Sequence, residues 1–200
     1  MRIYLLRHGE IDLQGEKRFI GQTDLPLNQN GTAQAYYWHR ELADVVFSGI
    51  FCSDLRRTYK TACIIAGHEN VQAMPQLREI KLGEWEGLSM LEIRTCFPDE
   101  WKKRGEDIVT YRPQGGESFA DLHARAVPVF EQISGESDGN VLIVAHGGVN
   151  RVILCHVLGM PADNLFRLNQ DYGCLNIIDC SRTPVQLTAM NIQGNLKLET

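Results

Sequence analysis

An apolar segment at the start of the chain ends abruptly in three residues suited to chemistry. Residues 2–6 contain no glycine or proline and favour extended structure, which predicts a buried strand. Arg7, His8 and Gly9 follow this segment directly. Because ligands of open α/β sheets bind beyond the carboxyl ends of the strands, we expect a functional site at this position.

A second segment of the chain has the same design. Residues 141–145 form another apolar run that ends at His146, after which Gly147 and a further glycine lead into a predicted helix. The glycines allow the backbone to approach a ligand closely, and the free amides at a helix start favour a phosphate. Two strand ends that each finish in His-Gly predict that His8 and His146 share one anion-binding site.

Two adjacent arginines open a predicted helix after a third strand-like run, over residues 49–52. The helix is expected to span residues 54–66, with Ser53 as its N-cap. Cations at the start of a helix are unfavourable with respect to its dipole, and a bound anion would account for Arg56 and Arg57 there. The planar guanidinium group binds phosphate oxygens in pairs, which suits arginine to this task.

Strand-like runs alternate with helical patterns along the chain. The expected strands cover residues 2–6, 49–52, 71–73, 141–145, 175–179 and 185–190, and the expected helices cover residues 31–43, 54–66, 118–133 and 148–158. This alternation predicts an α/β three-layer sandwich, with a mostly parallel central sheet and helices on both faces. Ser118 and Asp121 have capping-box spacing, whereas Pro128 is expected to kink or divide its helix.

One segment departs from this alternation. Residues 80–116 are rich in tryptophan, glycine, proline and charge, and they predict an insertion of short helices over the site that serves as a lid. The whole chain of 200 residues, of which 44% are apolar, fits a single domain over residues 1–200.

Composition and patterning argue against several classes of protein. The formal net charge of −5 gives no general attraction to nucleic acid, and no apolar run is long enough to span a membrane. The N-terminus lacks the pattern of a signal peptide, and the six cysteines are scattered without metal-binding spacing. We therefore expect a cytoplasmic protein without a metal or other cofactor, for which a homodimer is compatible with the sequence.

The separated blocks together resemble the histidine phosphatase superfamily, also called the phosphoglycerate mutase-like family. They follow the family's order from residue 2 to about residue 158: Arg7-His8-Gly9, GQTDLPL over residues 21–27 with Gly31, SDLRRTYKTA over 53–62, LREI over 77–80, GEWEG over 83–87, GGES over 115–118 and His146-Gly147. So many blocks in one order make the resemblance specific.

The resemblance implies a role for each matching residue. His8 would attack phosphorus and carry a phosphohistidine, while Arg7, Arg57 and His146 would hold the phosphoryl oxygens. Glu79 would protonate the leaving oxygen and later activate water. These residue types suit the reaction, because a neutral imidazole is not repelled by a phosphate dianion and fixed cations stabilise the transition state. An alkoxide leaves poorly, so a nearby carboxyl acid is needed.

Contacts are also predicted for four further residues. Gln14 and Gly147 are expected to bind phosphate, and Thr23 and Trp85 are expected to bind the rest of the substrate. Gln14 stands where many relatives have asparagine, and it keeps the amide donor on a side chain that is one methylene longer.

Three functions stay open on the residues alone. The first is hydrolysis of a small phosphorylated metabolite, because GEWEG and GGES resemble the α-ribazole phosphatases of cobalamin nucleotide-loop assembly and also broad-specificity phosphatases. The second is a cofactor-dependent phosphoglycerate mutase, although that group usually has a longer chain and a Tyr-Gly run where this sequence has IKLG. The third is a non-catalytic phosphate-binding protein, which the intact catalytic set disfavours.

Overall fold

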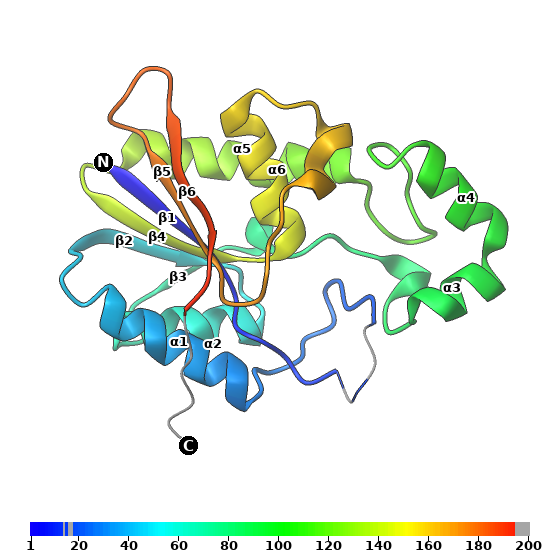
Figure 1. Ribbon diagram of the computed structural model, residues 1–200, viewed down its shortest axis with the longest axis horizontal. Helices are drawn as coiled ribbons and strands as arrows, with labels where there is room; N and C mark the ends of the chain where they lie inside the picture. Colours follow the sequence, from blue (N-terminus) through cyan, green and yellow to red (C-terminus); the bar gives the residue numbers. More distant parts are fainter. Residues whose placement is uncertain (14, 16–17, 195–200) are drawn as a thin grey trace.

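A six-stranded mixed sheet forms the centre of the computed structural model, which describes residues 1–13, 15 and 18–194 (Figure 1). The strands are β1 (Arg2–Arg7), β2 (Phe47–Cys52), β3 (Gln72–Ala73), β4 (Asn140–Ala145), β5 (Leu175–Asp179) and β6 (Gln186–Ile192). Their order is β3-β2-β4-β1-β5-β6, in which β1 to β4 are mutually parallel and β5 is antiparallel to both its neighbours. The mostly parallel sheet expected from the sequence is confirmed.

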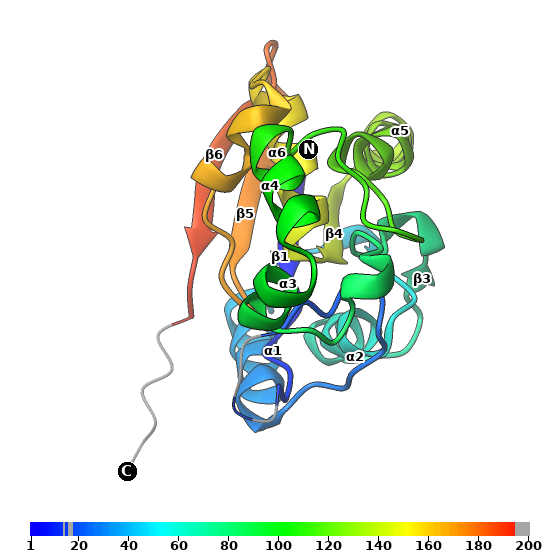
Figure 2. The same cartoon turned by 90° about the vertical axis from the view of Figure 1, so that its right-hand side faces the viewer.

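Helices cover both faces of this sheet. Helices α1 (Gln29–Glu41) and α2 (Arg56–Ala66) lie below it in Figures 1 and 2, and α5 (Phe119–Glu136) and α6 (Gly147–Leu158) lie above it. Short 3-10 helices η1 (Pro75–Leu77) and η3 (Ala162–Arg167) complete the main body. The three-layer sandwich expected from the sequence is therefore confirmed.

Side chains of β1 alternate between two hydrophobic cores, one on each face of the sheet. Ile3 and Leu5 pack into the core formed with α5 and α6, whereas Tyr4 and Leu6 pack into the core formed with α1 and α2. A strand that is buried on both faces must be apolar at successive positions, which explains why residues 2–6 read as one apolar run.

The start of α2 differs from the sequence-based prediction. The helix begins at Arg56 and not at residue 54, and Leu55 occupies the N-cap without a side-chain capping bond. The Ser53 hydroxyl instead accepts a hydrogen bond from Leu55 N–H inside the protein. The Asp24 carboxylate accepts the N–H of Arg56 at 2.8 Å, so a side chain from a distant loop takes the place of the expected cap.

Helix α5 confirms one expectation about its sequence and corrects another. Ser118 and Asp121 form the predicted capping box, in which each side chain binds the backbone N–H of the other residue. Pro128 does not divide the helix, which is continuous for 18 residues. Burial of its apolar face in the core compensates for the backbone hydrogen bond that proline removes.

Short helices occupy the insertion over residues 80–116, as the sequence predicts. They are η2 (Gly83–Trp85), α3 (Met90–Cys96) and α4 (Pro98–Glu106), and Figure 1 shows α3 and α4 beyond the carboxyl ends of the parallel strands. Ser89 and Glu92 form a capping box at the start of α3, and Pro98 stands at the first position of α4. Within the described ranges, no helix is long and apolar enough to cross a membrane.

Candidate active site

The pairing of β1 with β4 brings the two predicted histidines together. Arg7 pairs with Ala145 in the parallel register, and His8 N–H donates to the Ala145 carbonyl at 3.0 Å. The residues that follow these strand ends therefore face each other, and the ring centroids of His8 and His146 are 5.1 Å apart at an interplanar angle of 66°. Both rings are close enough to contact one phosphoryl group.

His8 is held in the state that a nucleophile requires. Its side chain is buried, and Nδ1 lies 2.7 Å from the Gly9 carbonyl oxygen. Because a carbonyl only accepts hydrogen bonds, Nδ1 carries the proton and Nε2 keeps its lone pair. Burial lowers the pKa of His8 well below its usual value, and the cations of Arg57 and Arg7 lower it further. The ring is therefore neutral at physiological pH.

Arg57 reaches the same place from α2. Its side chain is 1% exposed, and its two terminal nitrogens donate to the carbonyls of Thr23 and Gly21, each at 2.7 Å. These two bonds fix the plane of the guanidinium group, and burial lowers the pKa of Arg57. The second arginine of α2 is thus part of the site, whereas Arg56, which opens the helix, is exposed.

Arg7 is oriented by a C-terminal segment of the chain. Its Nη1 donates to the Gln170 carbonyl at 2.6 Å, and its guanidinium carbon lies 3.8 Å from the centroid of the Tyr172 ring. The Tyr172 ring also lies 5.5 Å from the His8 ring, measured between centroids. The loop after η3 therefore supports both the cation and the imidazole.

Several buried nitrogens around His8 have no hydrogen-bond partner in the described part of the chain. They are the Nε atoms of Arg7 and Arg57 and both ring nitrogens of His146. Burial, followed by the nearby cations and the His8 ring, lowers the pKa of His146 well below its usual value. Unpartnered buried donors are costly, and an anion with several acceptor oxygens would satisfy the two guanidinium Nε–H groups and the one N–H of a neutral His146.

Glu79 contacts the start of α6 beside these nitrogens. Its Oε2 accepts the N–H of Gly148 at 2.9 Å, and its Oε1 accepts the N–H of Ile80 at 2.9 Å. A Cβ atom on Gly148 would lie 2.3 Å from Glu79 Oε1, so only glycine permits this approach. Glu79 lines the same cavity as His8 and Arg57.

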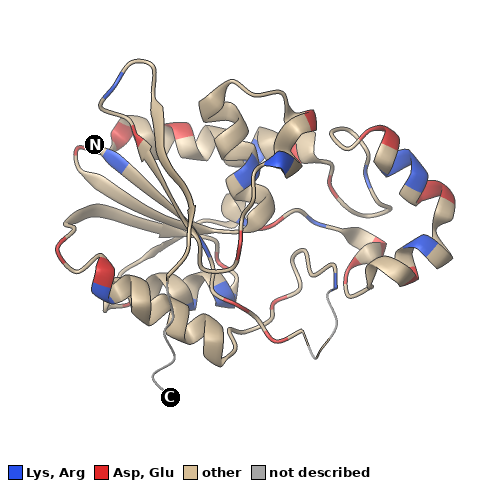
Figure 3. Ribbon diagram, in the orientation of Figure 1, with Lys and Arg blue, Asp and Glu red and all other residues tan. Residues whose placement is uncertain are grey.

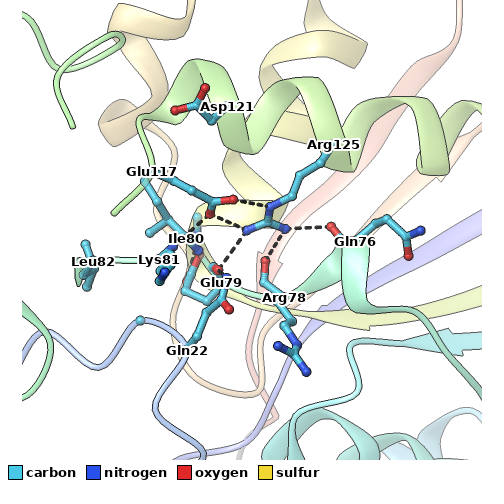
Figure 4. A network of polar contacts seen from close by, with 12 residues as sticks. Gln22, Gln76, Arg78, Glu79, Ile80, Lys81, Leu82, Glu117, Asp121 and Arg125 are labelled. Carbon is cyan, nitrogen blue, oxygen red and sulfur yellow. Dashed lines mark hydrogen bonds and ion pairs between the residues drawn. The ribbon is translucent and has the colours of Figure 1, made fainter. Parts of the chain in front are cut away.

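Arg125 of α5 holds the backbone before and at Glu79 (Figure 4). Its guanidinium group donates to the carbonyls of Gln76, Arg78 and Glu79 at 2.7, 2.7 and 2.9 Å. It also forms two parallel hydrogen bonds, of 2.9 and 2.8 Å, with the carboxylate of Glu117. All five N–H donors of Arg125 are used, so this side chain locks the segment that presents the carboxylate of Glu79.

A cavity of about 480 Å³ opens in front of these groups. Beyond the phosphate-sized region its walls are largely apolar, and the insertion over residues 80–116 supplies one side. The lining residues are Arg7, His8, Ile11, Arg18, Phe19, Ile20, Gly21, Arg57, Glu79, Ile80, Leu82, Met90, Arg104, Ile108, Tyr111, Pro113, Glu117, Phe119, Gly148, Arg151, Phe166 and Tyr172. A cavity of this size admits a phosphate together with a substantial leaving group.

The structure does not bring every expected contact residue to this cavity. The Thr23 hydroxyl donates to the Glu86 carboxylate at 2.7 Å, and the Thr23 carbonyl accepts a hydrogen bond from Arg57. Trp85 is 1% exposed and packs against Trp101 and other aromatic rings behind the cavity wall, so its position does not support direct substrate contact.

Gly147 lies beside two guanidinium groups at the start of α6. A Cβ atom there would lie 3.2 Å from Nη1 of Arg151 and 3.5 Å from Cζ of Arg7. Gln14 falls outside the described residues. In the described part of the chain, no group of three or more His, Cys, Asp or Glu side chains is arranged to hold a metal ion.

Sequence reasoning missed three supporting residues, which are Arg125, Gln170 and Tyr172. Arg125 carries no local signal, because its five acceptors come from two other segments of the chain. Gln170 contributes its backbone carbonyl, which no side-chain pattern marks. Tyr172 precedes a glycine in a short polar turn, and a cation–π partner for Arg7 is visible only in three dimensions.

A neutral buried imidazole among guanidinium groups, at the carboxyl edge of this sheet, defines an enzyme of phosphoryl transfer with a phosphoglycerate mutase-like fold. The model of the histidine phosphatase superfamily (branch 1) matches residues 3–193, and the chain belongs to this superfamily. The family resemblance inferred from the sequence is confirmed.

The named relatives include several phosphatases and a probable phosphoglycerate mutase of Serratia proteamaculans, which is 31% identical over 188 residues. The adenosylcobalamin/alpha-ribazole phosphatase of Escherichia coli (strain K12) is 28% identical over 194 residues, which are 96% of each chain. The glucosyl-3-phosphoglycerate phosphatase of Mycolicibacterium vanbaalenii is 32% identical over 173 residues, which are 82% of this chain and 76% of that protein. The crystal structure of a putative alpha-ribazole-5'-P phosphatase from Escherichia coli K-12 has a TM-score of 0.88 at 28% identity, and 96% of each chain is covered. The class of enzyme is thus a phosphatase.

Proposed function

We propose that this chain hydrolyses a small phosphomonoester through a phosphohistidine on His8. The observation that carries this proposal is the set of buried nitrogens of Arg7, Arg57 and His146, near the His8 ring, that have no partner among the described residues. The N–H groups among them come from β1, α2 and the residue after β4, and they suit the oxygens of one phosphoryl group. A structural histidine pair would have no need of such donors.

In the first step, Nε2 of His8 attacks phosphorus as the bond to the leaving oxygen breaks. Arg7, Arg57 and His146 stabilise the charge that spreads over the three equatorial oxygens. Glu79 donates a proton to the leaving oxygen, so the product alcohol departs neutral. The two backbone N–H groups that bind Glu79 hold its carboxyl beside the start of α6.

In the second step, a water molecule attacks phosphorus and the P–N bond of the phosphohistidine breaks. Glu79 accepts the proton of this water, and the electron pair of the P–N bond returns to Nε2. The products are orthophosphate and the original neutral His8. The hydrogen bond from Nδ1 to the Gly9 carbonyl keeps the ring in place through both steps.

Turnover and trapping of the intermediate test this proposal. The protein is expected to hydrolyse 4-nitrophenyl phosphate in the presence of EDTA, and alkaline quenching of a single turnover should leave acid-labile phosphate on the chain. His8→Asn should abolish both signals with an unchanged fold by circular dichroism, whereas His68→Asn, at an exposed histidine, should retain them. Near-normal turnover of His8→Asn would rule out His8, and loss of activity with EDTA would contradict a metal-free mechanism.

Two leaving groups are proposed from the relatives. One is α-ribazole, as in α-ribazole 5'-phosphate, and the other is a glucosylglycerate, as in glucosyl-3-phosphoglycerate; both are bulkier than a phosphate and suit the long cavity. The candidate substrates can be ranked by kcat/KM, measured for these two compounds, for 3-phosphoglycerate and for simple alkyl phosphates. Transfer between the 2- and 3-positions of phosphoglycerate, in place of hydrolysis, would favour the mutase.

We also propose a cytoplasmic location for this enzyme. All six cysteines are free, so they form no disulfide framework. Burial is the chief cause of a raised pKa at five of the thiols, which are those of Cys52, Cys63, Cys155, Cys174 and Cys180. Phosphatase activity that is retained in a reducing cell extract would support this location.

A further inference from the structure

Three arginines beyond the phosphate-binding residues line the same cavity, namely Arg18, Arg104 and Arg151. Arg18 forms an ion pair with Glu92 at 3.2 Å, whereas the other two share one aromatic ring. Arg104 belongs to α4 and Arg151 to α6, and Figure 3 shows basic segments on both helices. Their guanidinium carbons lie 5.7 and 5.4 Å from the centroid of one ring, that of Phe166 in η3. Phe166 is 52% exposed, so part of its ring is accessible at the cavity wall.

Neither of these two cations forms an ion pair with a carboxylate of the described residues. In the part of the chain that the structure describes, no carboxylate lies within 4.0 Å of either guanidinium group. Arg151 uses only its Nε, which donates to the Leu168 carbonyl at 2.9 Å, and Arg104 has cation–π contacts but no hydrogen bond to a described residue. In contrast, Arg112 and Arg125 each form a forked pair with a carboxylate.

Partial burial makes these two cations less favourable in the free protein. The pKa of Arg104 is lowered by burial, and the pKa of Arg151 is lowered first by burial and then by the cation of Arg7, while the carboxylates of Glu79 and Asp171 offset part of this effect. Cation–π contacts at these distances offset only part of such a cost, because each contributes modestly. A second anion in the cavity would restore the hydrogen bonds and the charge balance that both side chains lack.

The surrounding walls indicate what must link this second anion to the phosphate. Ile108 and Phe119 line the cavity together with Phe166, and Tyr111 adds a further ring. Apolar and aromatic surface of this kind fits the carbon skeleton of a leaving group, whereas a phosphate alone would leave it uncovered. The cavity is therefore built for a molecule with two charged ends.

We propose that Arg104, Arg151 and Phe166 form a second anion subsite, which selects phosphomonoesters whose leaving group carries a carboxylate or a phosphate. The subsite rests on the proposed phosphatase function, since it specifies the leaving group of that same reaction. It favours an anionic leaving group such as a glycerate over an uncharged nucleoside such as α-ribazole.

Matched aryl phosphates test the subsite directly. The probes are 3- and 4-carboxyphenyl phosphate, each compared with its carbamoyl analogue, which has nearly the same shape without the charge. Hydroquinone bisphosphate in the same assay distinguishes a second phosphate from a carboxylate. We expect kcat/KM to be about tenfold or more higher for an anionic probe than for its neutral analogue. The gain should appear in KM, because the second anion binds equally in the ground state and the transition state.

Substitutions locate the origin of this preference. Arg104→Gln and Arg151→Gln should each bring the ratio of anionic to neutral kcat/KM toward one. Arg94→Gln is the matched control, because Arg94 also lies over the Trp101 ring, at 5.7 Å, but is exposed and does not line the cavity. That variant should keep the wild-type ratio.

The outcomes separate this inference from the proposed function. Equal kcat/KM for anionic and neutral probes, or a ratio that the two variants leave unchanged, would overturn the subsite while hydrolysis itself continues. Absence of hydrolysis of every probe would instead overturn the phosphatase proposal, and the subsite with it.

Discussion

His8 and His146 occupy positions where burial decides the protonation of the imidazole. The lowered pKa of each ring means that the folded protein keeps both rings neutral at pH values where an exposed histidine is protonated. The unfolded chain therefore binds more protons than the folded chain as the pH falls below about 6.5. The contribution of the two neutral rings to the free energy of unfolding is fully present above that pH and is lost as the pH falls toward the pKa values of the folded protein.

This linkage predicts the effect of His146→Gln on acid stability. Each buried histidine adds a slope of about 1.4 kcal/mol per pH unit to the free energy of unfolding below pH 6.5. The variant should lose one such contribution, which urea denaturation at pH 7.5, 6 and 5 measures. The exposed His68→Gln provides the control and should reproduce the wild-type slope. Parallel pH profiles for His146→Gln and wild type would contradict a neutral buried His146.

Individual residues show which parts of the site could be predicted from the sequence and which could not. His8 and His146 were predictable, because each follows an apolar strand and precedes a glycine. Glu79 was identified from the family resemblance alone, since its bond to Gly148 N–H joins segments 69 residues apart. Trp85 was expected at the substrate, but aromatic rings pack together more often than they bind ligands, and it lies behind the wall.

At the scale of elements, α5 holds the segment of Glu79, the proposed acid, through one side chain. Arg125 spans three carbonyls of the segment before and at Glu79 and the carboxylate of Glu117, which also accepts Lys81 N–H at 2.9 Å. The helix, the Glu79 segment and the GGES turn therefore form one rigid unit. Arg125 is a positioning residue, because it contacts the backbone of Glu79 and does not line the cavity.

Arg125→Lys keeps the charge but removes the fork that binds this unit. We expect kcat to fall about 10- to 100-fold with KM little changed, because a misplaced Glu79 weakens proton transfer. The loss should be larger for an alkyl phosphate than for 4-nitrophenyl phosphate, whose leaving group hardly needs an acid. Steady-state kinetics on both substrates measure this difference.

Arg112→Lys is the matched control for that experiment. Arg112 forms the same forked pair with Asp121 of α5, but its side chain is 61% exposed and has no bond to the Glu79 segment. Its kinetics should resemble wild type on both substrates. An equal loss on alkyl and aryl phosphates in Arg125→Lys would indicate a general structural role and contradict positioning of Glu79.

Element boundaries were predictable wherever a local signal sets them. The capping box at Ser118 and the stop at Gly159 follow from neighbouring residues, and Gly159 adopts φ +60° as a helix C-cap. The start of α2 was not predictable, because Asp24 binds the N–H of Arg56 across 32 residues of sequence. Local patterns thus fail where a distant side chain supplies the cap.

Over the whole molecule, the site combines groups from segments that are far apart in sequence but adjacent at one edge of the sheet. The order β2-β4-β1 in the middle of the sheet juxtaposes the ends of these three strands, and thereby Arg57, His146 and His8. The loop after β1 also packs closely against α1, since a Cβ on Gly31 would lie 2.1 Å from the Glu10 carbonyl oxygen. Folding therefore concentrates positive charge in a protein with a formal net charge of −5.

This concentration of charge makes the stability of the whole protein sensitive to phosphate. Because orthophosphate would bind the folded protein and not the unfolded chain, the free energy of unfolding should rise by about 2.7 kcal/mol at a phosphate concentration of 100 times Kd. Urea denaturation at pH 7.5 with increasing phosphate measures the shift, and sodium chloride at equal ionic strength is the control for screening. His68→Gln should show the full shift, whereas Arg57→Gln should lose most of it, since Arg57 contributes a buried donor to the anion. Equal stabilisation by chloride and phosphate would mean that no anion is bound among the buried nitrogens, and the convergence of Arg7, Arg57 and both histidines would then need another explanation.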